Sequence, residues 1–281
     1  MIGFSTGFRI RWTSVSSPRW SQFCKPFMVL NAQRIATREK LILAGLYLSK
    51  YDSLGLRKLG FKGFKEAFNV IGYALGSQPA SIKNYRDEFD PLFPNRRKGW
   101  HKRPMREYCR KVLEEYKALD LETFTGLVRS FVGYDENAWS EIQADEEQGE
   151  GESNFAKRLI TGLAAEEYFV SVQPGLPEFG GYLLENTTRL GCGYDFRLRT
   201  DAQEDFLVVE VKGLRERTGS LSLTPKEHAV ATALRDRFFL FVVKNFHETP
   251  FHEIYRNPLS GVLQFRKSKR TTVHVSWLAS V

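Results

Sequence analysis

The stretch Leu207-Val208-Val209-Glu210-Val211-Lys212-Gly213 decides the fold of the second half of this chain. Its apolar and β-branched residues, ended by a glycine, predict a buried strand. Side chains alternate between the two faces of a strand, so Val209 and Val211 should enter the core while Glu210 and Lys212 share the other face. An anion and a cation are therefore expected side by side on a buried strand. They form either a structural ion pair or part of a site.

A second strand is predicted from Gly193 to Arg199, and the polar turn Thr200 to Asp205 joins it to the first as an antiparallel hairpin. The hairpin places Asp195 across from Glu210. Two carboxylates this close repel each other unless a cation lies between them, and Mg²⁺ is often held by one or two carboxylates plus phosphate oxygens. Lys212 beside them can orient or activate water, or stabilise charge on the phosphate. The three side chains predict phosphodiester hydrolysis, with Asp195 and Glu210 as ligands of Mg²⁺, for which Mn²⁺ can substitute.

The same residues carry a resemblance to known families. Asp195…Glu210-x-Lys212 resembles the active site of the PD-(D/E)XK nuclease superfamily, although Tyr194 stands where the superfamily's name has proline. A closer similarity is to the family of the C-terminal domain of the NO VEIN protein, which also occurs in restriction-type bacterial proteins. The motifs that carry it are Gly193-Tyr194-Asp195, Val209-Glu210-Val211-Lys212-Gly213 and Leu223-Thr224-x-x-Glu227. The resemblance extends over about Asn154 to Pro258.

The resemblance implies a fold, an activity and a fourth site residue. The motif Gly162-Leu163-Ala164-Ala165-Glu166 is similar to the family's N-terminal helix motif, whose glutamate joins the active site. Glu166 would then support the metal or its water shell. The implied fold is α/β, a restriction-endonuclease-like mixed sheet flanked by helices. The implied activity is Mg²⁺-dependent DNA cleavage in bacterial restriction or anti-phage defence.

Charge and cysteine content limit the class of protein. The 281 residues carry a formal net charge of +8, which suggests an anionic partner such as nucleic acid. Cys24, Cys109 and Cys192 are scattered, which argues against a disulfide framework and a cysteine-based zinc site. We therefore expect a reducing, cytoplasmic location. The apolar runs are too short to span a bilayer, so no membrane association is expected.

Composition divides the chain into four segments. Residues 1–33 form a poorly defined basic segment, which is either a transit peptide or an upstream region translated ahead of a true start at Met28; we prefer the second. Residues 34–134 are expected to form a small helical domain. Residues 135–153, which are strongly acidic, are expected to form a linker. Residues 154–281 are the nuclease-like domain.

The helical domain contains a helix-turn-helix pattern. Phe64, Phe68 and Ile71 lie at helical spacing, Gly76 breaks the helix, and Pro79 favours the start of a second one. This geometry is typical of DNA-binding units, but an ordinary helical hairpin is an equally good interpretation. In the DNA-binding interpretation, the second helix exposes Lys83, Asn84 and Arg86 to a groove or to phosphates.

A basic loop follows, from Phe93 to Pro104. Its cations suit phosphates, and an exposed tryptophan can stack against bases. The alternative is a solvated loop with its tryptophan folded into the small domain. Together with the helix-turn-helix, the loop favours binding of double-stranded DNA, with a homodimer as a possible assembly. The loop residues expected to contact DNA are Arg96, Arg97, Lys98, Trp100, Lys102 and Arg103.

The remaining pattern predicts further elements. Expected helices are Thr37 to Lys50, Met105 to Leu119, Leu121 to Val132, Asn154 to Val170, and one that starts at the Thr224 capping box and runs to about Asp236. Expected strands are Arg237 to Lys244 and Thr271 to Trp277. Leu54 to Gly63 is expected to be a glycine-punctuated connection. His247 and His252 are assigned to a loop without a metal role.

Two other functions are compatible with the sequence. A DNA-binding regulator with a non-cutting nuclease-like domain would keep the helical part but lose the chemistry; the retained Asp195, Glu210 and Lys212 argue against it. An RNA-processing nuclease would also explain the basic charge and Trp100. Assays with DNA, RNA and Mg²⁺ discriminate among the three.

Overall fold

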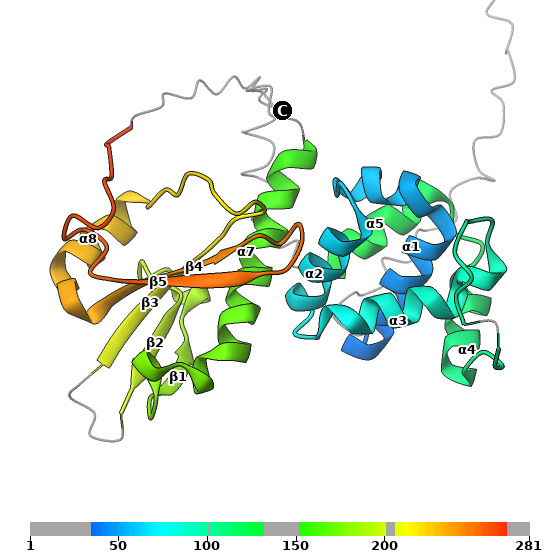
Figure 1. Cartoon of the computed structure of the whole chain (residues 1–281), viewed down its shortest axis with the longest axis horizontal. Helices are drawn as coiled ribbons and strands as arrows, with labels where there is room; N and C mark the ends of the chain where they lie inside the picture. Colours follow the sequence, from blue (N-terminus) through cyan, green and yellow to red (C-terminus); the bar gives the residue numbers. More distant parts are fainter. Residues whose placement is uncertain (1–34, 101, 132–151, 201–205, 269–281) are drawn as a thin grey trace, which may run out of the picture.

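The computed structural model describes residues 35–100, 102–131, 152–200 and 206–268 (Figure 1). The basic segment 1–33, the acidic residues 135–151, the hairpin turn 201–205 and the expected strand at 271–277 lie outside the described residues. A helical part comes first along the chain and a sheet with its own helices follows (Figure 1).

The helical part confirms the expected helix-turn-helix pattern. Gly76 lies in the turn between its two helices with φ of +63°, a left-handed conformation that favours glycine. The first helix of the part is longer than expected, because the chain resumes helical geometry after a single non-helical residue, Asp52, and buries Leu56 and Leu59. The expected connection at Leu54 to Gly63 is therefore wrong for Leu54 to Leu59, which are helical, and confirmed for Gly60 to Gly63. The helices are α1 (Thr37–Leu59), α2 (Phe64–Ala74), α3 (Pro79–Phe89), α4 (Glu107–Tyr116) and α5 (Leu121–Phe131).

In the described residues, the second part is a five-stranded mixed sheet in the order β1-β2-β3-β4-β5. Strands β1 to β3 are antiparallel neighbours, β3 and β4 are parallel, and β4 and β5 are antiparallel. Helix α8 makes the crossover between the two parallel strands. The elements are α7 (Glu152–Val172), β1 (Leu183–Asn186), β2 (Phe196–Arg199), β3 (Phe206–Gly213), α8 (Pro225–Leu234), β4 (Phe238–Lys244) and β5 (Phe251–Arg256). Single 3₁₀ turns occupy Asp90–Leu92, Gln173–Gly175, Pro177–Phe179, Thr188–Leu190 and Arg235–Arg237.

The two faces of the sheet bury different clusters. On the α7 face, Val209 and Val211 pack in the main core with Phe169, whose ring lies 4.8 Å from that of Phe241 between centroids. On the α8 face, Val208 packs with Ala231 in a separate small cluster. The alternation expected for β3 is therefore confirmed, and so is the mixed α/β architecture with helices preceding the sheet.

The helical part and the sheet part share one continuous hydrophobic core. Helix α2 lies against α7 (Figure 1). The ring of Tyr73 on α2 lies 5.2 Å from Tyr168 on α7 and 6.3 Å from Phe246 after β4. The side chain of Asn69 donates hydrogen bonds to the backbone carbonyls of Phe246 and Glu248 at 2.8 and 2.7 Å. The two parts are thus joined by packing as well as by polar contacts.

Two strands were not expected. β1 is only four residues long and largely exposed, so it lacks a strong apolar pattern. β5 is half-buried at the sheet edge, and it contains His252, which was assigned to a loop. Within the described ranges, no helix has the length and apolar character that crossing a membrane requires.

Candidate active site

The site is built on the β2–β3 hairpin. Phe196 pairs with Val209 in the antiparallel ladder, so Asp195, one residue before Phe196, stands opposite Glu210, one residue after Val209. The backbone N–H of Asp195 donates to the carbonyl of Val209 at 3.1 Å. The carboxylate of Asp195 accepts from the backbone N–H of Val211 at 2.8 Å. Backbone hydrogen bonds thus fix both the position and the side-chain direction of Asp195.

Lys212 connects the strand to helix α8. Its ammonium lies 2.6 Å from Oε1 of Glu210 and 3.0 Å from Oε2 of Glu227. Glu210 is nearly fully buried, and the Lys212 side chain is 23% exposed. The lysine therefore lies between two carboxylates at the edge of the buried region, where it remains reachable from solvent.

Burial and like charges set the ionisation of this cluster. Burial, reinforced by the charge of Asp195, raises the pKa of Glu210 to about 8. Burial also raises the pKa of Asp195, against the lowering effects of the Val211 N–H and of Lys212. Burial alone would lower the pKa of Lys212, but its ion pairs with Glu210 and Glu227 outweigh burial and raise it. Lys212 is therefore a protonated hydrogen-bond donor at neutral pH.

Glu166 approaches the site from helix α7. Burial raises its pKa to about 8, and the charges of Asp195 and Glu167 add to this effect while Lys212 opposes it. These interactions put Glu166 within electrostatic reach of Asp195 and Lys212. The structure thus brings Asp195, Glu210 and Lys212 into one cluster, with Glu166 beside them.

Glu227 has a role that the sequence interpretation did not assign. Thr224 and Glu227 form the expected capping box at the start of α8. The same Oε2 atom of Glu227 that accepts from the backbone N–H of Thr224 at 3.0 Å also receives Lys212. The motif Leu223-Thr224-x-x-Glu227 was the available signal, but it is fully explained by helix capping when read alone.

The chemistry of the donor set suits a hard cation. Among the described residues, Oδ1 of Asp195 and Oε2 of Glu210 have no hydrogen-bond donor. Burial, and after it the negative charge of Asp195, raises the pKa of Glu210, and a divalent cation beside the two carboxylates would offset both effects. In the described part of the chain, no group of three or more His, Cys, Asp or Glu side chains is placed to hold a metal. A two-carboxylate set fits Mg²⁺, which keeps water and phosphate oxygens as its other ligands.

The nucleic-acid candidates on α3 differ in exposure. Lys83 and Asn84 are exposed as expected, and Lys83 pairs with Asp87 at 2.7 Å. The expectation that Arg86 is exposed is wrong, because its guanidinium is buried over the rings of Phe64 and Phe68. The face of α3 that carries Arg86 therefore packs against aromatic rings and does not face solvent.

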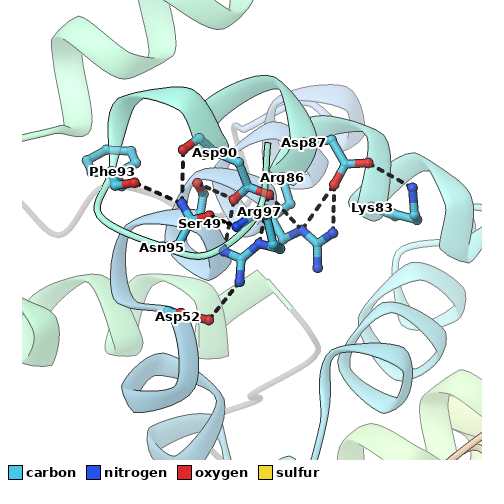
Figure 2. Close-up of polar contacts among 9 residues, drawn as sticks. All are labelled: Ser49, Asp52, Lys83, Arg86, Asp87, Asp90, Phe93, Asn95 and Arg97. Atoms are coloured by element: carbon cyan, nitrogen blue, oxygen red, sulfur yellow. Dashed lines mark hydrogen bonds and ion pairs between the residues drawn. The ribbon is translucent and has the colours of Figure 1, made fainter. Parts of the chain in front are cut away.

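Buried carboxylates explain why two of the expected DNA contacts are structural (Figure 2). Arg86 lies 2.6 Å from Asp87 and 3.4 Å from Asp90. Arg97 donates to both oxygens of Asp90 at 2.8 and 2.9 Å and to Asp52 at 2.8 Å. Arg97 is therefore committed to internal carboxylates and is not a free phosphate ligand.

The rest of the basic loop keeps its cations at the surface. Arg96, Lys98 and Lys102 are exposed, and no ion-pair partner for them is found in the described ranges. Arg103 lies 2.5 Å from the buried Glu88, yet its own side chain is 39% exposed. Trp100 is half-buried. It is therefore neither fully exposed, as the DNA-binding interpretation expected, nor fully folded into the helical part, as the alternative expected.

Comparison with known proteins agrees with the position of this site. No curated protein and no solved structure matches the chain. A family match runs from the end of α7 to the end of β5, so it includes Asp195, Glu210, Lys212 and Glu227, whereas Glu166 precedes it. The family resemblance expected from the hairpin motifs is thereby confirmed: residues 171–256 match the family described as Protein NO VEIN, C-terminal.

Proposed function

We propose that this protein is a Mg²⁺-dependent endonuclease that hydrolyses phosphodiester bonds in double-stranded DNA. The observation that carries the proposal is the cluster of Asp195, Glu210 and Lys212 on one hairpin. Carboxylates with raised pKa values beside a protonated lysine form a strained electrostatic arrangement that costs stability, and such arrangements concentrate at functional sites. The resemblance of these residues to PD-(D/E)XK nucleases supports the same reaction.

Each side chain has a role in the proposed reaction. Asp195 and Glu210 would hold Mg²⁺, which supplies Lewis-acid stabilisation and a more acidic bound water. Lys212, as a protonated donor, orients the attacking water and stabilises negative charge that develops on the phosphate. Glu166 would support the metal or its water shell from α7. Glu227 is a positioning residue that holds the Lys212 ammonium from α8.

The helical part supplies the proposed DNA-binding surface. Lys83 and Asn84 on α3 are exposed, as are the cations of the following loop. Such cations bind phosphates and release counterions, which supports affinity for a polyanion without fixing its sequence. Restriction or anti-phage defence in the cytoplasm is the setting we propose, on the basis of the family resemblance.

The test is cleavage by the full chain with Asp195→Asn and Glu210→Ala variants. Single-turnover assays on labelled duplex DNA with Mg²⁺ should show cutting by the wild type and none by either variant. Both variants should keep their fold, measured by circular dichroism. They should also keep DNA binding, because the exposed cations of α3 and the basic loop belong to the helical part.

Glu253→Ala is a matched control. Glu253 lies on β5 of the same sheet and also pairs with a lysine, Lys244, at 2.5 Å. The Glu253→Ala variant should cut duplex DNA at the wild-type rate. Wild-type cutting by Glu210→Ala would overturn the assigned site, and cleavage of RNA but not DNA would favour the RNA-processing alternative.

A further inference from the structure

The basic loop after α3 is held in a fixed shape. Gly99 has φ of +54°, and a Cβ atom there would lie 2.5 Å from the carbonyl oxygen of Asp87. Only glycine fits so close an approach. The next residue, Trp100, donates its backbone N–H to the same carbonyl at 2.8 Å. Asn95 donates its side-chain amide to the carbonyls of Asp90 and Phe93, both at 2.9 Å (Figure 2). The loop therefore presents Trp100 from a defined position.

Two guanidinium groups accompany the indole ring. The guanidinium carbon atoms of Arg103 and Arg106 lie 4.5 and 5.2 Å from the Trp100 ring centroid. The carboxylate of Glu88, whose side chain is 1% exposed, pairs with both arginines at 2.5 and 2.9 Å. A buried anion thus fixes the arginines next to the ring, so little side-chain entropy is lost when a ligand binds.

These side chains border a shallow cavity that is largely open to solvent. Its volume is about 830 Å³, and it is lined by Gly99, Trp100, Lys102, Arg103 and Arg106. This volume lies within the range of about 300–1,000 Å³ that is usual for small-molecule sites. Among the described residues, three cations line the cavity, and the buried carboxylate of Glu88 offsets only part of their charge. The cavity therefore combines an aromatic surface with excess positive charge.

We propose that this cavity binds one unstacked nucleotide, with its base against Trp100 or the Arg103 guanidinium plane and its phosphate on Lys102 and Arg103. Aromatic rings and guanidinium planes are the surfaces on which unstacked bases stack, and lysine and arginine are the usual phosphate ligands. The proposal rests on the nucleic-acid substrate proposed above, but it does not depend on cleavage. It assigns Lys102 and Arg103 to a single unstacked nucleotide and leaves the other exposed cations of the helical part, Lys83, Arg96 and Lys98, to the duplex.

The chemistry favours a nucleotide over an acidic peptide. A peptide carboxylate would use the cations but leave the indole ring without a planar partner. A phosphate attached to an aromatic base uses both at once. The two sources of this chemistry are a free nucleotide and a nucleotide within a single strand, and the binding experiment separates them.

The test is calorimetric titration of the full chain in EDTA with deoxyadenosine 5′-monophosphate, inorganic phosphate and an acidic peptide. We expect the nucleotide to bind at least tenfold more tightly than phosphate or the peptide. Trp100→Ala should abolish this preference and Trp100→Phe should keep it. Lys102→Ala, a substitution at an exposed residue, should weaken nucleotide binding several-fold, whereas Lys111→Ala on α4 should not.

A short single strand and its duplex identify the source. If the site takes a nucleotide within a strand, the single strand should bind more tightly than the free nucleotide and in a Trp100-dependent manner, and the duplex should not show this dependence. The proposal would be overturned if phosphate and nucleotide bound with equal affinity. It would also be overturned if Trp100→Ala or Lys102→Ala bound the nucleotide as tightly as the wild type. If the protein binds the nucleotide but does not cut DNA, only the proposed nuclease function is contradicted. If it cuts DNA but does not bind the nucleotide, only the proposed nucleotide subsite is contradicted.

Discussion

Lys212 is expected to act on the chemical step, because its ammonium is fixed between Glu210 and Glu227 and its raised pKa keeps it protonated. A protonated lysine cannot ligate a metal. Lys212→Ala should therefore lower the single-turnover rate by about a hundredfold to a thousandfold while DNA and Mg²⁺ binding change little. The variant should also be less stable, because Glu210 loses its cation.

A purely structural ion pair gives another result for this lysine. In that case, Lys212→Ala would be less stable, but its folded fraction would cut normally. Lys244→Ala is the matched control, since Lys244 pairs with Glu253 at 2.5 Å on the same sheet. Normal single-turnover cleavage by folded Lys212→Ala would end the catalytic assignment of this lysine.

The ionisation of Glu166 should make stability depend on pH. Its folded-state pKa of about 8 lies above the ordinary value of 4.5, so the folded protein holds a proton that the unfolded chain releases. The stability that the protonated Glu166 side chain contributes is therefore fully present below about pH 4.5, and it is lost as the pH rises through 8. Without metal, Glu166→Gln should unfold a few degrees higher than the wild type at pH 8 and at nearly the same temperature at pH 4.5.

The neighbouring Glu167 is the control for this pH dependence. Burial alone raises its pKa, whereas Asp195 and Glu167 both add to the shift of Glu166. The Glu167→Gln variant should therefore show a smaller rise in unfolding temperature at pH 8 than Glu166→Gln. Thermal unfolding in EDTA across this pH range measures both variants. A Glu166→Gln gain that is equal at both pH values would contradict the argument.

At the scale of the element, the first turn of α8 combines helix capping with positioning of the lysine. Thr224→Ala removes the cap and should cost about 1 kcal/mol of unfolding free energy, but it leaves the Glu227 carboxylate next to Lys212. Glu227→Gln removes that charge and should lower the cleavage rate as well. The comparison of kcat with KM separates the roles: Thr224→Ala should change neither, and Glu227→Gln should mainly lower kcat. Equal kinetic effects would show that only the cap matters.

The elements that the sequence predicted are those with strong local signals. β3 has an apolar, β-branched run interrupted only by Glu210 and Lys212, α8 has a complete capping box, and the α2–α3 turn has Gly76 and, three residues later, Pro79. The predicted hairpin turn, together with the alternation of side chains between the two faces of a strand, was sufficient to place Asp195 opposite Glu210. β1 and β5 were missed because short, half-buried edge strands carry little apolar alternation.

The side chains that the sequence misplaced depend on contacts between different elements. Arg86 was assigned to the surface because a helical wheel shows only its own helix. The rings of Phe64 and Phe68, on the preceding helix, cover it. Likewise, Arg97 was assigned to DNA because nothing local shows that Asp52 turns toward it. Charge alone does not separate a phosphate ligand from a buried ion pair.

At the scale of the whole molecule, the helical part is tied to the end of β3, the strand that carries the candidate site. Arg215 follows β3 by two residues and pairs with Glu66, a fully buried residue of α2. A second pair, Lys62 with Glu216 at 3.0 Å, joins the same two parts but is exposed on both sides. Because Arg215 is so close in sequence to Lys212, the contact of Glu66 restrains the backbone that leads out of the site.

These two ion pairs should differ strongly in their contribution to stability. Arg215→Ala leaves the Glu66 carboxylate buried without its cation and should cost about 3 kcal/mol, the lower end for a broken buried pair, because Arg215 is 25% exposed. Glu216→Ala should cost about 1 kcal/mol or less, since exposed pairs contribute little. Urea unfolding of the full chain measures both. The double variant Glu66→Gln with Arg215→Met should recover most of the loss, because no buried charge remains unpaired. Equal losses for Arg215→Ala and Glu216→Ala would show that the shared hydrophobic core, and not the buried ion pair, holds the two parts together.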